Sequence, residues 1–467
     1  MRTRRLLLAA ASALILLPAL GGPAGAAGPR QAPAETLVTS SFLLTGPEYL
    51  DKHGNPTEDL TDPAVQKRLA ATKSTARKAP PPGPDESHRR ALADGATYGT
   101  PSERFAGDTD ALLADDITPD ECRENSELSG RDQGWIKNHF SYCWLGVYGA
   151  VQARCVGFIC VPVGGFSARI TLIGVAYNGL RNVEMLPILD QVGSWGTAEA
   201  GFFTFEAECN GDPAGSCVTS SDEVTRTPQQ WKDDGESTLY YHSPASDPSE
   251  AAGEQIAHGT FDTEARFRFP QRGVSDDGPS TQVRFDSAWY LAQKNGSIFN
   301  LTDPWLSYDV NDQEVKYSAW NIYNAQKFPE QTEPIVAGKD LPGASADEPL
   351  HRMFKNKTQR KLNRTTAVRY CNQRWPGYAD LGQDCDEYPF ACTAEGAATG
   401  QYAVRPIPAP DNQEAGRRLG SWFSADRIID GDAFYVKIFG AEGSAPEPPG
   451  GVPTIPDDTI DCGDGAE

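Results

Sequence analysis

The sequence lacks two patterns: the paired cysteines of a structural zinc site and, after its first residues, the long apolar run of a membrane-spanning helix. None of its ten cysteines forms a Cys-x-x-Cys pair, which argues against a structural zinc site. After the first 27 residues no stretch is apolar enough to cross a bilayer. The cysteines therefore favour disulfides, and their spacing suggests local bridges such as Cys209 to Cys217 and Cys371 to Cys385, although connectivity cannot be deduced from sequence.

The long hydrophobic run that the chain does contain lies at its start. Three arginines precede an apolar run from Leu6 to Leu20, and the small-residue stretch Ala24-Gly25-Ala26 follows. This order is typical of a secretory signal, and the run is shorter than the roughly 20 residues of a spanning helix. We expect residues 1–26 to be a signal peptide and the mature protein to be secreted and extracellular, without a transmembrane span.

Positive charge is also scarce. The 467 residues hold 42 Lys and Arg against 64 Asp and Glu, a formal net charge of −22. This charge would repel a polyanion if it were evenly spread, but screening makes local patches matter more than the total. Residues 27–120 are rich in Pro, Ala and charge, so we expect a mostly flexible segment with one short helix around Asp62 to Ala71, which starts at Pro63.

Residues 121–330 show a period of two. Phe203, Phe205 and Ala207 alternate with polar residues, and the same pattern recurs elsewhere between turn-rich pieces. The pattern predicts half-buried strands and an antiparallel β-sandwich. The domain holds little recognisable chemistry, since His139, His242 and His258 are isolated and residues 309–314 read as a turn, without the glycine of a calcium loop. It could bind a cell-wall polymer or nucleic acid, but the sequence does not distinguish these partners.

Acidic residues disappear after a Pro/Gly-rich boundary at 331–349. Residues 351–375 contain eight Lys and Arg and neither Asp nor Glu. A solvated helix face is the usual interpretation of such a run. Its position directly before an acidic cluster favours a phosphodiester enzyme instead, because cations hold a nucleic-acid backbone and acids hold a metal ion.

The acidic cluster spans Cys385 to Glu395, and it includes the adjacent pair Asp386 and Glu387. No histidine follows His351, so we expect a carboxylate rather than an imidazole to serve as general base. A divalent metal would then stabilise the leaving oxyanion, and oxygen ligands suit Mg²⁺, Mn²⁺ or Ca²⁺ better than zinc.

The remaining sequence predicts a small α+β unit. Residues 401–407 read as a strand, Asp411 as a helix N-cap that pairs with Glu414 in a capping box, and residues 432–438 as a closing strand. The residues Ala415, Leu419, Trp422 and Phe423 fall on one apolar helix face. We expect this domain to span residues 350–440 and to be followed by a flexible acidic tail, 441–467.

The motif from Cys385 to Ala391, with Glu395-Gly396, Val404-Arg405, Asp411-Asn412 and Gly416, resembles the secreted bacterial deoxyribonuclease domain NucA/NucB. The resemblance covers about Leu362 to Ile438. It implies a relative of the ββα-metal nucleases in which an aspartate replaces the histidine base. The chain departs from the family at Ala394 to Ala397, where one acidic-Gly-Gly position is altered, and at Cys392.

The resemblance implies roles for individual residues. Asp386 would be the base, Glu387 would support or contribute to catalysis, and Glu395 and Asn412 would lie on the metal side. From the charge of the basic run and its position beside the acids, we expect Arg364, Arg369 and Arg374, together with Arg405, to bind DNA. The predicted architecture is thus multidomain, with a central all-β antiparallel sandwich and a C-terminal ββα-metal-like metal-dependent endodeoxyribonuclease.

Two other functions fit parts of the sequence. A glycosidase also uses paired carboxylates, but Asp386 and Glu387 are neighbours on a strand and should point to opposite faces. A non-catalytic cell-wall-binding or toxin-delivery protein would depend on the β-sandwich instead.

Overall fold

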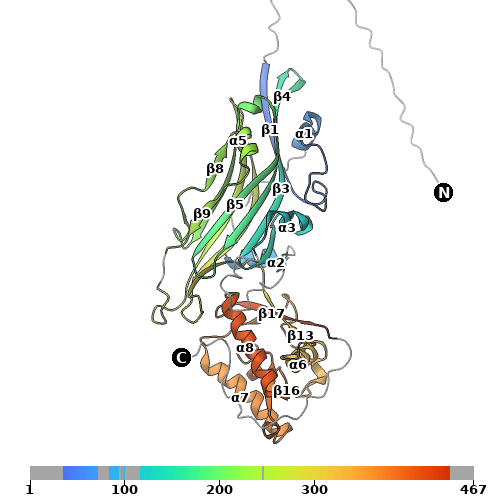
Figure 1. Cartoon of the computed structure of the whole chain (residues 1–467), viewed down its shortest axis with the longest axis vertical. Coiled ribbons are helices and arrows are strands. Elements are labelled where there is room, and N and C mark those ends of the chain that lie inside the picture. The colour runs from blue at the N-terminus through green and yellow to red at the C-terminus, as the bar shows by residue number, and fades with distance from the viewer. Residues whose placement is uncertain are drawn as a thin grey trace, which may run out of the picture.

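A computed structural model describes residues 35–71, 84–93, 96, 98–99, 116–244 and 247–441. These residues form a long unit of β-sheets and a smaller C-terminal unit of helices and short strands (Figure 1). The predicted signal peptide and the acidic tail after Ala441 lie outside the described residues.

Two antiparallel sheets build the long β unit. The seven-stranded sheet has the order β1-β3-β4-β5-β9-β7, with β2 paired to β3, and the five-stranded sheet has the order β12-β11-β10-β6-β8. The first contains β1 (Glu35–Leu44), β2 (Trp135–Asn138), β3 (Ser141–Val156), β4 (Ile159–Ala176), β5 (Asn182–Gly196), β7 (Val218–Thr219) and β9 (Leu239–His242). The second contains β6 (Phe202–Asp212), β8 (Glu223–Arg226), β10 (Gln255–Arg268), β11 (Gly273–Ser287) and β12 (Asn295–Phe299). The predicted antiparallel β structure is therefore confirmed.

Alternating apolar residues from both sheets form one hydrophobic core. Phe203 and Phe205 of β6 are buried, as the period of two predicts, and they belong to the same apolar cluster as Phe166 of β4. The ring of Phe166 stacks on Phe267 of β10 with 4.6 Å between centroids. Residues that alternate outward remain exposed, for example Phe202 at 45%.

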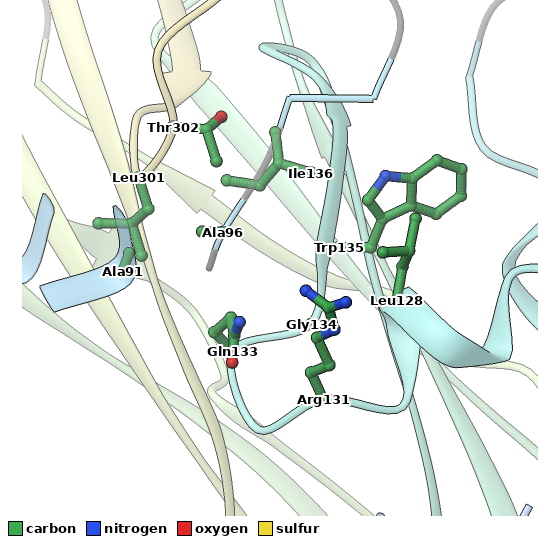
Figure 2. Close-up of a pocket in the computed structure, with 10 residues that line it drawn as sticks. All are labelled: Ala91, Ala96, Leu128, Arg131, Gln133, Gly134, Trp135, Ile136, Leu301 and Thr302. Atoms are coloured by element: carbon green, nitrogen blue, oxygen red, sulfur yellow. The ribbon is translucent and has the colours of Figure 1, made fainter. Parts of the chain in front are cut away.

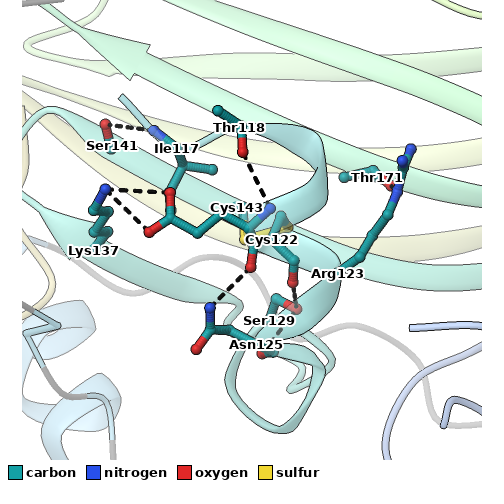
Figure 3. Close-up of a disulfide and its surroundings, with 11 residues drawn as sticks. Ile117, Thr118, Cys122, Arg123, Asn125, Ser129, Lys137, Ser141, Cys143 and Thr171 are labelled. Atoms are coloured by element: carbon teal, nitrogen blue, oxygen red, sulfur yellow. Dashed lines mark hydrogen bonds and ion pairs between the residues drawn. A yellow bond between two sulfur atoms is a disulfide. The ribbon is translucent and has the colours of Figure 1, made fainter. Parts of the chain in front are cut away.

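Short helices pack against these sheets. They are α1 (Pro63–Ala70), α2 (Pro84–Ala93), α3 (Pro119–Glu124), α4 (Ser126–Ser129) and α5 (Pro228–Asp233). The predicted helix at Pro63 is confirmed, with the Asp62 carboxylate accepting from the Ala64 amide at 2.7 Å. A disulfide between Cys122 and Cys143 ties α3 to β3 (Figure 3).

The prediction of a mostly flexible segment at residues 27–120 is wrong for part of its length. Strand β1 pairs with β3 over its whole length, from Glu35 opposite Val156 to Leu44 opposite Val147. The sequence of β1 contains enough apolar residues to bury one end, where Phe42 is 1% exposed. The proline-rich stretch before Pro84 lies outside the described residues.

The C-terminal unit combines two small sheets with three helices. A three-stranded sheet has the order β13-β17-β14, with β13 parallel to β17, and β15 pairs with β16 in an antiparallel hairpin. The elements are β13 (Trp305–Asp309), α6 (Lys316–Lys327), β14 (Leu350–His351), α7 (Lys357–Arg374), β15 (Gln383–Tyr388), β16 (Ala403–Pro408), α8 (Ala409–Ala425) and β17 (Ala433–Phe439). The predicted closing strand at 432–438 corresponds to β17, and the apolar face of α8 is buried as predicted.

The predicted domain boundary needs a correction. Strand β13 and helix α6 fall inside the range 121–330 that was assigned to the β domain, yet their buried residues share a core with α8 and β17. The reason is that β13 pairs with β17, more than 120 residues later in the chain. Periodicity alone cannot reveal such a distant partner.

Buried charges join the two units. Arg427, just after α8, is fully buried and its guanidinium binds Asp286 of β11. Its Nη1 atom also donates to the side chain of Asn178 at 2.7 Å. Arg284 of β11 binds Asp432 at 2.7 Å. The C-terminal unit is thus docked on the β unit through one fully buried ion pair and a second, partly exposed one.

Four disulfides occur among the described residues. Two of them, Cys209–Cys217 and Cys371–Cys385, confirm the bridges that their spacing suggested. Cys155–Cys160 and Cys122–Cys143 are the others. In the described ranges, no helix is long and apolar enough to cross a membrane.

Candidate functional site

The β15–β16 hairpin separates the two adjacent carboxylates. Successive side chains of a strand point to opposite faces, so Asp386 and Glu387 lie on different sides of the hairpin. Asp386 receives a hydrogen bond from Asn321 of α6, whereas Glu387 binds Arg364 of α7. Helices α6 and α8 therefore cover one face and α7 the other, consistent with the packing of both groups of helices against the hairpin.

Asp386 is a buried carboxyl group with few stabilising partners. It is 8% exposed, and the Nδ2 atom of Asn321 donates to its Oδ2 atom at 3.0 Å. Burial raises the pKa of Asp386 well above its ordinary value, and the charges of Glu387 and Asp411 raise it further. A buried carboxyl group with a raised pKa is a candidate proton acceptor, because a higher pKa makes the carboxylate a stronger base.

Arg405 and Asn412 lie on the same side of the hairpin as Asp386. Arg405 is directly opposite Asp386 in the antiparallel register, and directly opposed residues project from the same face. Asn412 is three residues before Ala415 and seven before Leu419, so it shares the α8 face that is packed on the hairpin. Both side chains are half-buried. An acid, a cation and an amide thus lie on the face of the hairpin that α8 covers.

The prediction that Asp411 caps the N-terminus of α8 is wrong. The helix begins at Ala409, so Asp411 is not its N-cap. The Asp411 carboxylate instead accepts from the backbone amides of Tyr317 and Ser318 at 2.8 and 2.9 Å, at the start of α6. A carboxylate is favourable there because the first amides of a helix lack partners within it.

The predicted capping-box partner also has another role. Glu414 forms ion pairs with Arg417 and Arg418, and these hydrogen bonds lower its pKa to about 2. Gln413 provides a further link between helix and hairpin, because its amide donates to Asp384 at 3.1 Å. These contacts hold the first turn of α8 against the strand that carries Asp386.

Glu387 forms a structural ion pair beneath α7. It is 8% exposed, and Arg364 binds both its carboxylate and the Cys385 carbonyl, the latter at 2.5 Å. Burial raises the pKa of Glu387, while the charge of Arg364 opposes that shift. The nearby Cys371–Cys385 disulfide fixes the same helix to the strand. The charge of Arg364 is therefore neutralised inside the protein, although the sequence predicted that it binds substrate.

Glu395 does not join the residues around Asp386. Its carboxylate accepts from the backbone amide of His351 at 3.0 Å and lies 2.8 Å from the His351 Nδ1 atom. The adjoining Arg352 bonds to the backbone of Gly431, which follows the C-terminal end of α8. Asn412 lies in the first turn of α8, so the two predicted metal-side residues are anchored at opposite ends of a helix of 17 residues.

The sequence interpretation missed His351 and Asn321. We expected no imidazole near the acids, yet the side chain of His351 is 45% exposed and contacts Glu395, which raises the pKa of the imidazole. Asn321 escaped notice because it lies 65 residues before Asp386, in a segment assigned to the β domain. Neither contact has a local sequence signal, since both depend on tertiary packing.

The predicted basic run forms helix α7 and presents one free basic face. Lys357, Lys361 and Arg369 are exposed at spacings that place them on one side of the helix. None of the three has an ion-pair partner among the residues that the structure describes. Arg374 is exposed as well, but it is paired with Glu333 at 3.0 Å. The free cations thus extend from the first residue of α7, Lys357, to Arg369 in its second half.

The donors around Asp386 suit a divalent ion only in part. Across the described ranges, no group of three or more His, Cys, Asp or Glu side chains could hold a metal ion. Asp386 and Asn412 offer oxygen atoms, which Mg²⁺ prefers, and Mg²⁺ usually binds through one or two carboxylates, with water and substrate phosphate completing its shell. The donor chemistry thus fits an ion that binds together with substrate better than a resident metal centre.

A pocket elsewhere in the β unit lacks comparable chemistry. It lies between α2 and the start of β2 and is lined largely by apolar side chains, including Ala91, Leu128, Ile136 and Leu301 (Figure 2). Arg131 supplies its charged group. No predicted site residue lines it, so we place the candidate site at the β15–β16 hairpin.

Comparison with known families supports that placement. Residues 345–437 match the family model described as Deoxyribonuclease NucA/NucB, which confirms the resemblance. The matched range contains Asp386, Glu387, Glu395 and Asn412 and covers the C-terminal unit from β14 to β17, but not β13 or α6. Searches of curated proteins and of solved structures gave no match to the chain.

Proposed function

We propose that this protein is a secreted, metal-dependent endodeoxyribonuclease whose C-terminal unit hydrolyses DNA phosphodiester bonds. The match of residues 345–437 to a deoxyribonuclease family carries this proposal. The chain order of β15, β16 and α8 supports a ββα-metal-like arrangement. Four disulfides among the described residues favour an oxidising compartment, in agreement with the predicted export signal.

Asp386 is the general base in this proposal. Its raised pKa places proton acceptance nearer neutral pH than an ordinary carboxylate would, and Asn321 holds one of its oxygens. The other oxygen takes the proton from the attacking water. Arg405, on the same face, binds a phosphate oxygen and balances its negative charge.

Asn412 is the residue we assign to the metal side. A bound Mg²⁺ or Mn²⁺ would stabilise negative charge on the leaving oxygen. Asn412 would offer its side-chain oxygen from the first turn of α8, with substrate phosphate and water as the remaining ligands. Glu395 serves instead to orient His351, because the two are in direct contact.

A glycosidase is a poorer interpretation. Retaining and inverting glycosidases place two carboxyl groups on either side of one scissile bond. Here the adjacent carboxylates face different helices, and Glu387 is engaged by Arg364. A purely non-catalytic role for the β unit would leave the nuclease-family match unexplained.

The test is plasmid cleavage by the purified full chain with and without Mg²⁺ or Mn²⁺. We expect Asp386→Asn to reduce the rate at least about 100-fold, the lower range for loss of a general base. The amide has nearly the same shape and can still accept from Asn321, so the thermal unfolding midpoint should not fall. Asp380→Asn, at an exposed acid of the same unit, is the matched control.

Two results would contradict the proposal. Full cleavage in excess chelator would rule out metal dependence. Full cleavage by a folded Asp386→Asn variant would rule out Asp386 as the base, whereas equal loss in Asp380→Asn would indicate a general charge effect.

A further inference from the structure

The hairpin between β3 and β4 ends in an exposed apolar tip. Phe158 is 107% exposed, Ile159 73%, Val161 57% and Val156 44%. Large apolar side chains that are this exposed and this close together usually mark an interaction surface. The tip lies at the end of the β unit farthest from the C-terminal unit (Figure 1).

The tip projects beyond the rest of its sheet. Strand β5 ends at Gly196, opposite Gly164 of β4, so the last part of the hairpin has no β5 partner. At about 3.3 Å per residue, Ile159 lies roughly 17 Å beyond that point. Strand β1 accompanies the hairpin to its end, where Glu35 is opposite Val156. The projection is thus a ribbon of three strands with an apolar end.

The tip is held rigid before any partner binds. The disulfide between Cys155 and Cys160 closes the hairpin across its last residues. Gly157 adopts a φ of 63°, which favours glycine, and Val156 pairs with Ile159 around the turn. Little conformational entropy would therefore be lost when the exposed side chains are buried.

The chemistry of the tip favours a bilayer over a protein partner. From Cys155 to Phe166 no side chain carries a nitrogen or oxygen atom. The nearby charges on β1 and β3, Glu35 and Arg154, are paired with each other at 3.2 Å. Protein interfaces typically contain one hydrogen bond per 100–200 Å², which this tip could supply only from its backbone. A convex, uncharged tip instead suits the boundary between lipid headgroups and acyl chains.

We propose that the β3–β4 tip inserts shallowly into the surface of a lipid bilayer and attaches the protein to it. Burial of Phe158 and Ile159 provides the binding energy. Attraction to anionic lipid does not, because no side chain of the tip from Cys155 to Phe166 is charged. The C-terminal unit, at the other end of the molecule, then remains in water (Figure 1).

Vesicle co-sedimentation of the full chain tests this proposal. We expect binding to phosphatidylcholine vesicles that changes little between low and high salt and is not strengthened by added phosphatidylglycerol. Phe158→Ser and Ile159→Ser should each weaken binding at least about tenfold, because each removes a large apolar group from the contact. Leu180→Ser is the matched control, since Leu180 is 54% exposed in the turn at the opposite end of β4.

Thermal unfolding midpoints and size-exclusion chromatography accompany the binding assay. Equal midpoints for all variants show that a loss of binding is not a loss of fold. The proposal is overturned if the wild-type chain does not bind vesicles, or if Leu180→Ser weakens binding as much as the tip variants. A dimer that the tip substitutions convert to a monomer, with vesicle binding unchanged, would show that the tip pairs with a second copy instead.

Discussion

At the scale of single residues, the burial of Asp386 is the most informative feature of the C-terminal unit. A carboxyl group kept in an apolar environment is costly once ionised. Asp386 receives one side-chain hydrogen bond, from Asn321, and the negative charges of Glu387 and Asp411 disfavour its ionised form. Its position therefore weakens the fold at neutral pH. Such a group is expected where catalysis, rather than stability, determines the residue.

The pH dependence of cleavage should report on Asp386. A base acts when deprotonated, so activity falls as pH drops through its pKa, and the raised pKa places this acid limb above the ordinary range of a carboxyl group near 4. Asn321→Leu removes the donor that favours the ionised form, so it should move the acid limb to higher pH. The rate at the high-pH plateau should change less than the rate on the acid limb.

Asn324→Leu is the control for that measurement. Asn324 lies one turn after Asn321 on α6 and is half-buried. Its substitution should leave the acid limb in place. An unchanged limb in Asn321→Leu would mean that a group other than Asp386 determines the profile.

At the scale of elements, the helix with a free basic face supports a second prediction. Lys357, Lys361 and Arg369 of α7 are exposed and lack an acidic partner among the described residues. Each cation that binds a phosphate releases counterions, so binding weakens as salt rises. Substituting each of the three by Gln should reduce the slope of log affinity against log salt by about one for every phosphate that is no longer neutralised.

DNA binding by the inactive Asp386→Asn chain allows this slope to be measured without cleavage. Lys327→Gln, at an exposed position in the last turn of α6, is the control and should leave the slope unchanged. If the three α7 variants keep the wild-type slope, DNA does not follow this face of the helix.

Asp411 shows what the sequence could and could not predict. Its position before an apolar helical pattern predicts an N-cap of α8, but the carboxylate caps α6, whose residues lie more than 90 positions earlier. Local patterns did predict β17, the apolar face of α8 and the Cys371–Cys385 bridge, because these depend on neighbours in the chain. Contacts between distant segments, such as Asn321 with Asp386, leave no periodic signal.

The four predicted site residues show the same difference between local patterns, which the sequence reveals, and contacts between distant segments, which it does not. The motif indicates acids at Asp386 and Glu387, and strand alternation alone separates them onto two faces. It does not reveal that Glu395 meets His351, since that contact depends on the pairing of Arg352 with Thr393, 41 residues later in the chain. The roles of these residues stay predictions that the plasmid assay can test.

At the scale of the whole molecule, the two units depend on buried ionic contacts. Arg427 and Asp286 are both fully buried, and the Asp432–Arg284 pair lies beside them. Gly296 is also part of this arrangement, because a Cβ atom there would lie 2.2 Å from the Nε atom of the Arg427 guanidinium. The β unit thus accommodates one particular side chain of the C-terminal unit.

Burial also keeps the neighbouring histidine neutral. It lowers the pKa of His139 to about 3, and the Nδ1 atom of His139 lies 2.6 Å from the Asp426 carbonyl oxygen. Tyr98 adds a hydrogen bond to the Asp426 carboxylate at 2.9 Å. Because the folded pKa is depressed below the ordinary value of 6.5, neutral His139 contributes its full stability above pH 6.5, and this is lost as pH falls toward 3.

Removing one partner of the buried pair should lower the unfolding temperature of the C-terminal unit below that of the β unit. Arg427→Met leaves the Asp286 carboxylate buried with Arg284 as its remaining cation, a change that typically costs about 3–5 kcal/mol. We expect calorimetry to show the C-terminal unit unfolding at a lower temperature than the β unit. The double variant Arg427→Met/Asp286→Asn should recover part of the loss, because it removes the uncompensated charge as well.

Arg266→Met provides the comparison at a partly exposed cluster of ion pairs on the five-stranded sheet, where the loss should be about 1 kcal/mol or less. If Arg427→Met and Arg266→Met destabilise the protein equally, or if all variants unfold in one transition at the wild-type midpoint, then the buried pair does not determine how the two units are held together.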